Sequence, residues 1–274
     1  MSRPFLKMNG LGNAFVVVEA REQPFEPSPD EVRAINGHTP YDQLISIEPS
    51  RGAGESAFVR FWNNTGEEVG ACGNGARAAA WLLMEAGGQD AVSFGTDGGP
   101  LKSTRAGDKI VTVDMGEPRL DWEQIPLAEE MDTRGIELQV GPIDNPHLHT
   151  PGAVSMGNPH VVFFVDEEPS DALVRGSGSL VEHHPLFPEG VNVGFAWVKA
   201  RDRIRLRVWE RSAGLTRACG TGACAALVAA ARRGLSGRKA TMELDGGELT
   251  VEWRESDGHV IMTGPVEVEF AGRL

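Results

Sequence analysis

The chain has 274 residues, of which 41% are apolar, and its 26 basic and 39 acidic residues give a formal net charge of −13. This length can bury one large or two medium hydrophobic cores, and the apolar content is that of a globular protein. The acidic balance argues against nucleic acid or an anionic membrane as a partner. The N-terminus lacks the apolar stretch of a signal peptide, and no apolar run is long enough to span a bilayer, so we expect a cytoplasmic protein.

Taken in chain order, the first half predicts several strands around one helix. Alternating or β-branched residues favour strands at 58–62 and 109–115. An Ala-rich segment at 74–86 predicts a helix that ends at Gly87-Gly88. A linker between two halves is expected near 116–121, where Pro118 breaks the pattern.

The second half repeats this order. Strands are expected at 203–209, 248–253, 259–264 and 266–270, and a helix near 221–233 that ends at Gly234. Both predicted helices are apolar on nearly every side, which indicates that they are buried. Each half is therefore expected to wrap its sheet around one central helix, and the last strand has no counterpart in the first half.

An internal duplication explains this similarity. The phrase Ala-Cys-Gly-X-Gly-Ala occurs at 71–76 and again at 218–223, 147 residues later. The segments 60–63 and 207–210 keep the same offset, and Asp-Gly-Gly and Gly-Asn segments recur at similar offsets. Chance similarity of Gly- and Ala-rich segments is the alternative, but order and spacing agree at four places.

The duplication predicts an α/β fold of two pseudo-symmetric halves. Each half is expected to be a mostly antiparallel or mixed β-sheet around a buried helix, with the active site in the cleft between the halves. We set the boundaries at 1–118 together with the C-terminal strand 264–274 for the first half, and at 119–263 for the second.

Cys72 and Cys219 precede the two predicted helices, where free N–H groups and the helix dipole stabilise an anion. This position lowers the pKa of a thiol, and the adjacent glycines let a ligand carboxylate approach the backbone. Two such thiols could invert a carbon centre, one removing a proton and the other supplying one. Packing, or a disulfide that a reducing compartment disfavours, is the alternative. We expect Cys224 to be a core residue.

Polar residues gather near the same segments. Asn favours turns for local reasons, and Glu210-Arg211 could be an exposed ion pair, but as a set these residues could bind a zwitterion. The set is Asn13, Gln43, Asn63, Asn74, Asn158, His160, Asn192, Glu210 and Arg211. Without a CxxC pair, P-loop, dinucleotide fingerprint or lysine in a recognisable cofactor setting, we expect neither metal nor cofactor.

The chain resembles the diaminopimelate epimerase family of cofactor-independent epimerases. The resemblance rests on these segments: KMNGLGNAF, YDQL, RFWNNTGEEVGACGNGAR, VSMGNPHVV, EHHPLFPEGVNVGF, RVWERSAGLTRACGTGACAA and DGGELTVEW. It implies interconversion of LL- and meso-diaminopimelate in lysine and peptidoglycan precursor biosynthesis. The resemblance also implies a homodimer that binds this small amino acid as its substrate. The chain departs from the family pattern at Ala14, at 38–43, at 63–67 and at 77–79.

The resemblance also implies residue roles. Cys72 and Cys219 would be the catalytic acid and base, and His160 and Glu210 would tune their proton transfer. The backbone at Gly73-Asn74 and Gly220-Thr221 would bind the reacting carboxylate. The other substrate contacts would be Asn13, Gln43, Asn63, Asn158, Asn192, Glu210 and Arg211. A racemase of another amino acid, of histidine or proline type, and a thiol-redox sensing protein are the alternatives.

Overall fold

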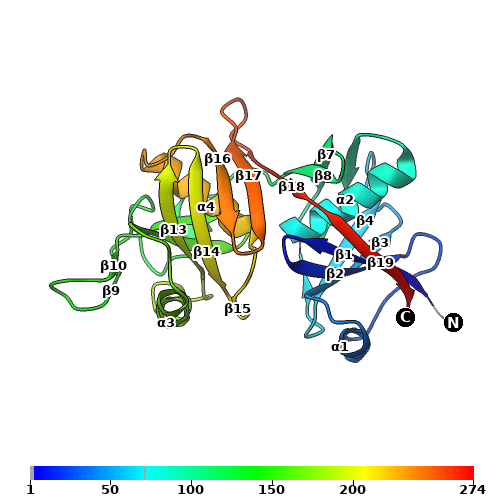
Figure 1. Ribbon diagram of the computed structural model, residues 1–274, viewed down its shortest axis with the longest axis horizontal. Coiled ribbons are helices and arrows are strands. Elements are labelled where there is room, and N and C mark those ends of the chain that lie inside the picture. The colour runs from blue at the N-terminus through cyan, green and yellow to red at the C-terminus, as the bar shows by residue number, and fades with distance from the viewer. Residues whose placement is uncertain (1–2, 71) are drawn as a thin grey trace. The chain divides into compact units, whose positions relative to one another are not determined.

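The computed structural model describes residues 3–70 and 72–274, and the chain divides into two compact units (Figure 1). Unit 1 contains Met1–Asp114 and Thr263–Leu274, and unit 2 contains Met115–Met262. Within the described ranges, no helix is long and apolar enough to cross a membrane.

Unit 1 contains a six-stranded sheet in the order β19-β1-β2-β3-β4-β5. Its strands are β1 (Pro4–Gly10), β2 (Asn13–Glu19), β3 (Gln43–Glu48), β4 (Phe58–Asn63), β5 (Glu68–Val69) and β19 (Glu267–Arg273). The last strand of the chain, β19, pairs antiparallel with β1. A second group of antiparallel strands consists of β6 (Ala91–Phe94), β7 (Leu101–Gly107) and β8 (Ile110–Asp114).

Helix α2 (Gly73–Gly87) is the central helix of unit 1. It packs against β1, β2, β3, β6, β7 and β8, so both groups of strands cover it. Its alanines 76 and 78–80, together with Leu83 and Met84, are buried, which confirms the burial predicted from an apolar surface all round. The helix ends at Gly87 and is capped by Gly88, whose φ of 62° is the left-handed conformation that glycine adopts without strain.

The main strands of unit 2 run in the order β11-β12-β13-β14-β16-β17-β18 within the 11-stranded sheet, and β15 pairs with β14. The strands are β11 (Gly152–Ser155), β12 (Pro159–Val165), β13 (Asn192–Ala200), β14 (Arg203–Glu210), β15 (Gly214–Leu215), β16 (Lys239–Leu244), β17 (Gly247–Trp253) and β18 (Val260–Pro265). Helix α4 (Gly220–Arg232) packs against β11 to β14, β16 and β17, and its residues from Gly222 to Ala230 are buried. Strand β18 begins in unit 2 and ends in unit 1.

The duplicated order is visible in both units. In each, two antiparallel strands precede the central helix and two more follow it: β4, β5, α2, β6, β7 in unit 1 and β14, β15, α4, β16, β17 in unit 2. The prediction of a mixed α/β fold built from two similar halves is confirmed.

Each unit also has a second helix that the sequence pattern did not predict. Helix α1 (Pro29–His38) starts with a capping box between Ser28 and Glu31, and helix α3 (Asp171–Glu182) starts at Ser170. Helix α1 has only 10 residues, and α3 contains two glycines, which weaken the helix signal. Unit 2 further contains η1 (Trp122–Gln124) and a hairpin of β9 (Gln139–Val140) and β10 (Leu148–His149).

Candidate active site

The two helix-start cysteines occupy the same structural position. Cys72 and Cys219 are the N-cap residues of α2 and α4, and both have extended backbone conformations. The Sγ of Cys72 accepts the N–H of Gly75 at 3.3 Å, and the Sγ of Cys219 accepts the N–H of Gly222 at 3.4 Å. Each sulfur therefore takes the place of the oxygen that Ser, Thr, Asp or Asn supplies at an ordinary N-cap. Such a sulfur can hold a negative charge, which the N-terminal amides stabilise.

Glycine at N3 of each helix makes room for this arrangement. A Cβ built on Gly75 would lie 3.0 Å from the ring of Phe61, and one on Gly222 would lie 3.1 Å from the Sγ of Cys219. A side chain at either position would push the helix start away from its strand or the sulfur away from the amide. The Gly-X-Gly pattern is thus a packing requirement of the cap.

The duplicated Asp-Gly-Gly turns hold the two cysteine segments. The N–H of Gly98 donates to the carbonyl of Gly70 at 2.8 Å, and the N–H of Gly246 donates to the carbonyl of Arg217 at 2.8 Å. Each carbonyl belongs to the residue two positions before a cysteine. The repeat of this turn was visible in the sequence, but its role in fixing the cysteine segment required the tertiary structure.

Three candidate residues of unit 1 share the sheet face that packs on α2. Phe61 and Ile45 approach Gly75, and Phe15 approaches Gly10, so these side chains face the helix. Because side chains alternate along a strand, the residues two positions away lie on the same face. These residues are Asn13, Gln43 and Asn63. Gln43 is paired with Phe15 on one side and with Asn63 on the other, which places all three at one end of the sheet.

The Oε1 atom of Gln43 is buried and accepts no hydrogen bond from the described residues. A buried acceptor without a donor costs free energy, which is about 1–3 kcal/mol when the donor is lost by mutation. Such an atom is most simply explained by a ligand or water that supplies the donor.

The segments that depart from the family pattern still pack together. The N–H of Ala14 donates to Oδ2 of Asp42 at 2.7 Å, and the N–H of Asp42 donates to the carbonyl of Ala14 at 2.9 Å. These two bonds hold the start of β2 beside the start of β3. Asn13 and Gln43 are therefore positioned by hydrogen bonds between the backbone of Ala14 and the backbone and carboxylate of Asp42, which do not need the family's usual side chain at residue 14.

A hydrogen-bonded chain in unit 2 leads from Cys219 to His160. The Sγ of Cys219 lies 3.7 Å from Oγ1 of Thr221, Nδ2 of Asn158 donates to that Oγ1 at 3.3 Å, and Oδ1 of Asn158 lies 3.0 Å from Nε2 of His160. His160 is 1% exposed. Burial, and then the charge of Arg211, lower the pKa of His160 to about 3, so its imidazole is neutral at pH 7.

The Cys219 thiol is held in its protonated form. Burial, and then the charge of Glu210, raise its pKa well above the ordinary value, and bonds from Thr221 and the N–H of Gly222 oppose this only in part. The hydroxyl of Thr216 donates to Oε1 of Glu210 and keeps this carboxylate in place. In this state Cys219 is a proton donor.

Asn192 and Glu182 fix the segment that carries Glu210 and Arg211. Asn192 accepts the N–H of Arg211 at 3.0 Å and donates to the carbonyl of Pro159 at 2.8 Å, so it joins two site loops. Glu182 is 5% exposed and accepts the indole N–H of Trp209 and the backbone N–H of Ser212, each at 2.7 Å. Sequence reasoning missed Glu182, although the EHHPLFP segment contains it.

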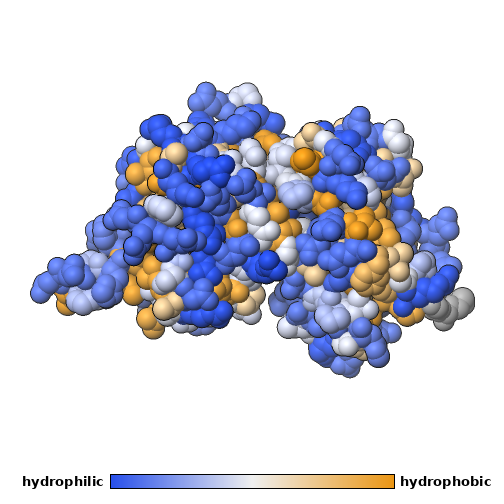
Figure 2. All heavy atoms as spheres, in the orientation of Figure 1, coloured by the Kyte–Doolittle hydropathy of each residue, from blue (hydrophilic) through white to orange (hydrophobic). Residues whose placement is uncertain are grey.

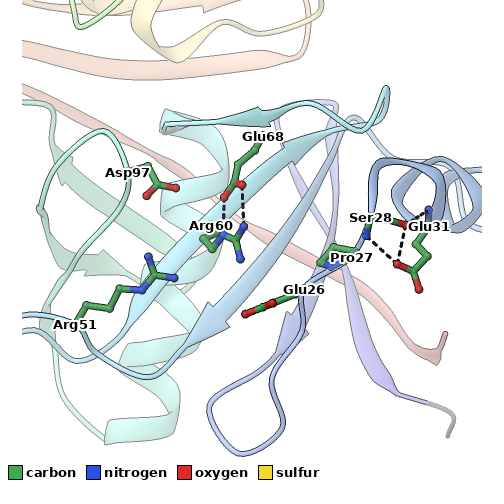
Figure 3. A pocket seen from close by; sticks show the side chains of 8 residues that line it. All are labelled: Glu26, Pro27, Ser28, Glu31, Arg51, Arg60, Glu68 and Asp97. Carbon is green, nitrogen blue, oxygen red and sulfur yellow. Dashed lines mark hydrogen bonds and ion pairs between the residues drawn. The ribbon is translucent and has the colours of Figure 1, made fainter.

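A cavity of about 490 Å³ also lies in unit 1, on the sheet face that carries Arg60 (Figure 3). It is lined by Glu26, Pro27, Ser28, Glu31, Arg51, Arg60, Glu68 and Asp97. Figure 3 shows two hydrogen bonds from the guanidinium of Arg60, through Nε and Nη2, to the two carboxylate oxygens of Glu68. Arg51 binds Glu48 at 2.8 Å. The guanidinium groups that line this cavity are thus paired with carboxylates, and none of the candidate residues lines it. Within the described ranges, no group of three or more His, Cys, Asp or Glu is arranged to hold a metal.

The duplicated α/β fold resembles that of several solved structures, among them proteins described as epimerases. A structure described as a predicted epimerase from Pseudomonas aeruginosa has a TM-score of 0.69 at 17% identity, with 100% of this chain and 99% of that chain covered. A hydroxyproline epimerase from Agrobacterium vitis has a TM-score of 0.68 at 16% identity, with 100% and 92% covered. At these identities the likeness concerns the fold alone.

Sequence comparison gives the family. The model of the diaminopimelate epimerase family matches residues 5–120 and 152–269. A diaminopimelate epimerase from Caulobacter sp. (strain K31) is 67% identical, with 100% of this chain and 98% of the relative covered. One from Phenylobacterium zucineum (strain HLK1) is 62% identical over the same shares. The chain belongs to the diaminopimelate epimerase family, and residues 121–151, which carry η1, β9 and β10, lie outside the match.

Proposed function

We propose that this chain interconverts LL- and meso-2,6-diaminopimelate, and that Cys72 and Cys219 exchange the α-proton of the substrate without a cofactor. The observation that carries the proposal is the pair of sulfur N-caps, one at the start of each central helix. The high identity to relatives that bear this name supports the choice of substrate. The reaction would serve lysine and peptidoglycan precursor biosynthesis in the cytoplasm.

The reaction requires a base and an acid on opposite faces of one α-carbon. A thiolate removes the α-proton, a thiol delivers a proton to the other face, and the configuration inverts. The backbone N–H groups at Gly73-Asn74 and Gly220-Thr221 would bind the α-carboxylate and stabilise the negative charge that develops during proton removal. These groups lie in the first turns of α2 and α4, where the amides have no helical acceptors.

His160 and Glu210 would act on the state of Cys219. The neutral imidazole of His160 adds no positive charge that would turn this thiol into a thiolate before substrate arrives. The carboxylate of Glu210 favours the protonated thiol, in accord with the raised pKa of Cys219. Together they would keep a proton available for transfer.

The distal amino-acid end of the substrate needs donors and acceptors. The buried Oε1 of Gln43 would accept a hydrogen bond from the distal ammonium group, and the guanidinium of Arg211 suits a carboxylate. Asn13, Asn63, Asn158 and Asn192 would supply the remaining contacts. A ligand that lacks the distal end would leave the oxygen of Gln43 unpaired, which selects against it.

We also propose a homodimer. Strand β19 is the edge strand of the sheet in unit 1, and Phe270 on it is 50% exposed. Figure 2 shows apolar residues gathered on the side of unit 1 where Figure 1 labels β19. A second copy of the chain would cover the edge and its aromatic side chain. Light scattering after gel filtration tests this, with Phe270→Glu expected to give the monomer.

Exchange with deuterated solvent tests the function. Incubation with LL-diaminopimelate in D2O should replace the α-proton by deuterium and produce the meso isomer, both followed by proton NMR. Cys72→Ala and Cys219→Ala should each abolish epimerisation, and Cys224→Ala is the matched control because Cys224 is buried inside α4. Full activity of either N-cap variant, or turnover of a monocarboxylic amino acid in place of diaminopimelate, would overturn the proposal.

A further inference from the structure

Arg77 is the largest of the fully buried side chains among the described residues. It lies on α2, five positions after Cys72. The duplication offset of 147 residues pairs it with Cys224 of α4, which is also fully buried. The same position of the repeated fold thus holds an arginine in unit 1 and a cysteine in unit 2.

The second repeat serves as an internal control for the first. Burying a guanidinium is unfavourable unless well-placed hydrogen bonds offset the lost hydration. Helix α4 is buried at the same place without such a cation, so the fold does not require one at this position. The arginine is then best explained by what lies near it in unit 1.

The guanidinium of Arg77 contacts the first turn of α2, whose N-cap residue is Cys72. Its Nη1 donates to Oδ1 of Asn74 at 3.0 Å, and its Nε donates to the carbonyl of Pro265 at 3.4 Å. A Cβ on Gly10 of β1 would approach Nη2 within 3.3 Å, so the sheet closes over the group. These acceptors are neutral, and the contact with Asn74 ties the cation to the first turn of α2.

Neighbouring elements present few other charges to this turn. On the α2 face of the sheet, the strands contribute Met8, Gly10, Asn13, Phe15, Gln43, Ile45, Phe61 and Asn63. Lys7 and Glu48 lie on the opposite face, where Lys7 donates to the carbonyl of Pro40 and Glu48 binds Arg51. On β7, Arg105 pairs with Glu85 in the last turn of α2.

Two acidic groups precede or flank the Cys72 segment. Glu68 is four residues before Cys72 and is paired with Arg60, so its charge is largely compensated. Asp97 begins the turn that holds Gly70. The charge near Cys219 is negative instead. In the second repeat Glu210 occupies the position of Asn63, and its carboxylate raises the pKa of Cys219.

We propose that Arg77 is a positioning residue that makes Cys72 the thiolate of the resting enzyme, while Glu210 leaves Cys219 as the thiol. The inference rests on the proposed function, since it assigns the starting protonation state of the same two groups. Cys72 then accepts the α-proton of one epimer and becomes a thiol, and Cys219 gives its proton to the opposite face and becomes a thiolate. The reverse reaction starts from this exchanged state, and a proton shift between sulfurs and solvent restores the resting one.

Alkylation of a single remaining thiol measures this state directly. In the full chain with Cys219→Ala and Cys224→Ala, Cys72 is the only cysteine, and the rate of its reaction with iodoacetamide against pH gives its pKa. A unit charge at about 10 Å and an effective dielectric of about 20 shifts a pKa by about one unit. Arg77→Met should raise the pKa of Cys72 by about this amount, and Arg77→Lys, which keeps the charge, should restore most of the shift.

Arg51→Met is the matched control, because it removes a partly exposed cation of unit 1 that is paired with Glu48. It should leave the profile of Cys72 unchanged. An equal shift in Arg51→Met, or no shift in Arg77→Met, overturns the inference. Should Arg77→Met fail to fold by circular dichroism, the decisive comparison is between the Cys72-only and Cys219-only chains with Arg77 intact, where Cys72 must ionise at the lower pH.

Failure of this inference differs from failure of the proposed function. Alkylation reports the ionisation of Cys72 in the absence of substrate. If the pH profile of Cys72 is the same in Arg77→Met and epimerisation still depends on Cys72, only the role proposed for Arg77 is wrong. Loss of that dependence would remove the function itself.

Discussion

The indole N–H of Trp209 donates to the buried carboxylate of Glu182 at 2.7 Å, and the other oxygen of that carboxylate accepts the N–H of Ser212 at the same distance. Trp209 and Ser212 flank the two residues Glu210 and Arg211. One side chain at the end of α3 thus fixes both ends of the segment that carries a carboxylate and a guanidinium of the proposed site. Burial opposes ionisation of Glu182, but these two bonds, together with the charges of His183 and Arg211, outweigh it and hold its pKa below the ordinary value.

Glu182→Gln should therefore destabilise unit 2 and weaken catalysis together. The amide has one oxygen for two donors, and its NH2 would face the second donor, at a cost of about 1–3 kcal/mol. Urea unfolding measures the loss, and kcat/KM should fall as Glu210 and Arg211 shift. Adding Trp209→Phe removes one donor, so the double variant should lose less than the sum of the single losses. Additive losses would show that the shared carboxylate does not couple the two donors.

His160 predicts a pH dependence of stability with a defined sign. Its pKa is about 3 in the folded chain against 6.5 in a model peptide, so the unfolded chain binds the extra proton between these values. The contribution of His160 to the free energy of unfolding is therefore fully present above pH 6.5. It is lost as the pH falls toward 3, by up to about 1.4 kcal/mol per pH unit.

The free energy of unfolding of the parent chain and of His160→Gln, measured between pH 4 and 8, checks this dependence. The variant should show a shallower loss between pH 6.5 and 4, because glutamine does not titrate. Parallel curves for the two proteins would contradict the neutral, buried imidazole.

The central helices and their cysteine caps were predictable because local signals agree there. The predicted ranges 74–86 and 221–233 lie within a residue or so of the observed Gly73–Gly87 and Gly220–Arg232, since glycines mark both ends. The helices α1 and α3 were missed because α1 has only 10 residues and α3 carries two glycines, which weaken the helix signal. Glu182 and the N–H of Gly98 could not be assigned from sequence, because their partners are set by tertiary packing and lie 27 to 30 and 28 residues away.

Gly99 tests the turn that holds the Cys72 segment. Its φ of 112° belongs to a region that only glycine adopts easily, and a Cβ there would meet no atom within 4 Å. Gly99→Ala should thus destabilise the chain through backbone strain alone, by about 1 kcal/mol or more, and lower kcat as the segment from Gly70 to Cys72 shifts.

Gly37→Ala is the matched control for this substitution. Gly37 lies in α1 with equally open surroundings, where alanine should stabilise the helix by about 0.5–1 kcal/mol and leave kcat unchanged. Thermal unfolding and initial rates distinguish the two variants. Unchanged stability and rate in Gly99→Ala would mean that the turn does not set the position of the cysteine segment.

Glu210→Gln should lower the pKa of Cys219. Burial raises this pKa first and the charge of Glu210 second, so removing the charge leaves the thiol above its ordinary value but closer to it. The glutamine oxygen can still accept the hydroxyl of Thr216, which keeps the geometry. In the chain with Cys72→Ala and Cys224→Ala, the pH profile for alkylation of Cys219 should move to lower pH. The same substitution in the enzyme that retains all three cysteines should slow the direction in which Cys219 donates the proton, because a larger fraction of Cys219 is then thiolate. A profile that does not move would assign the raised pKa of Cys219 to burial alone, and Glu210 would then have no electrostatic role in proton transfer.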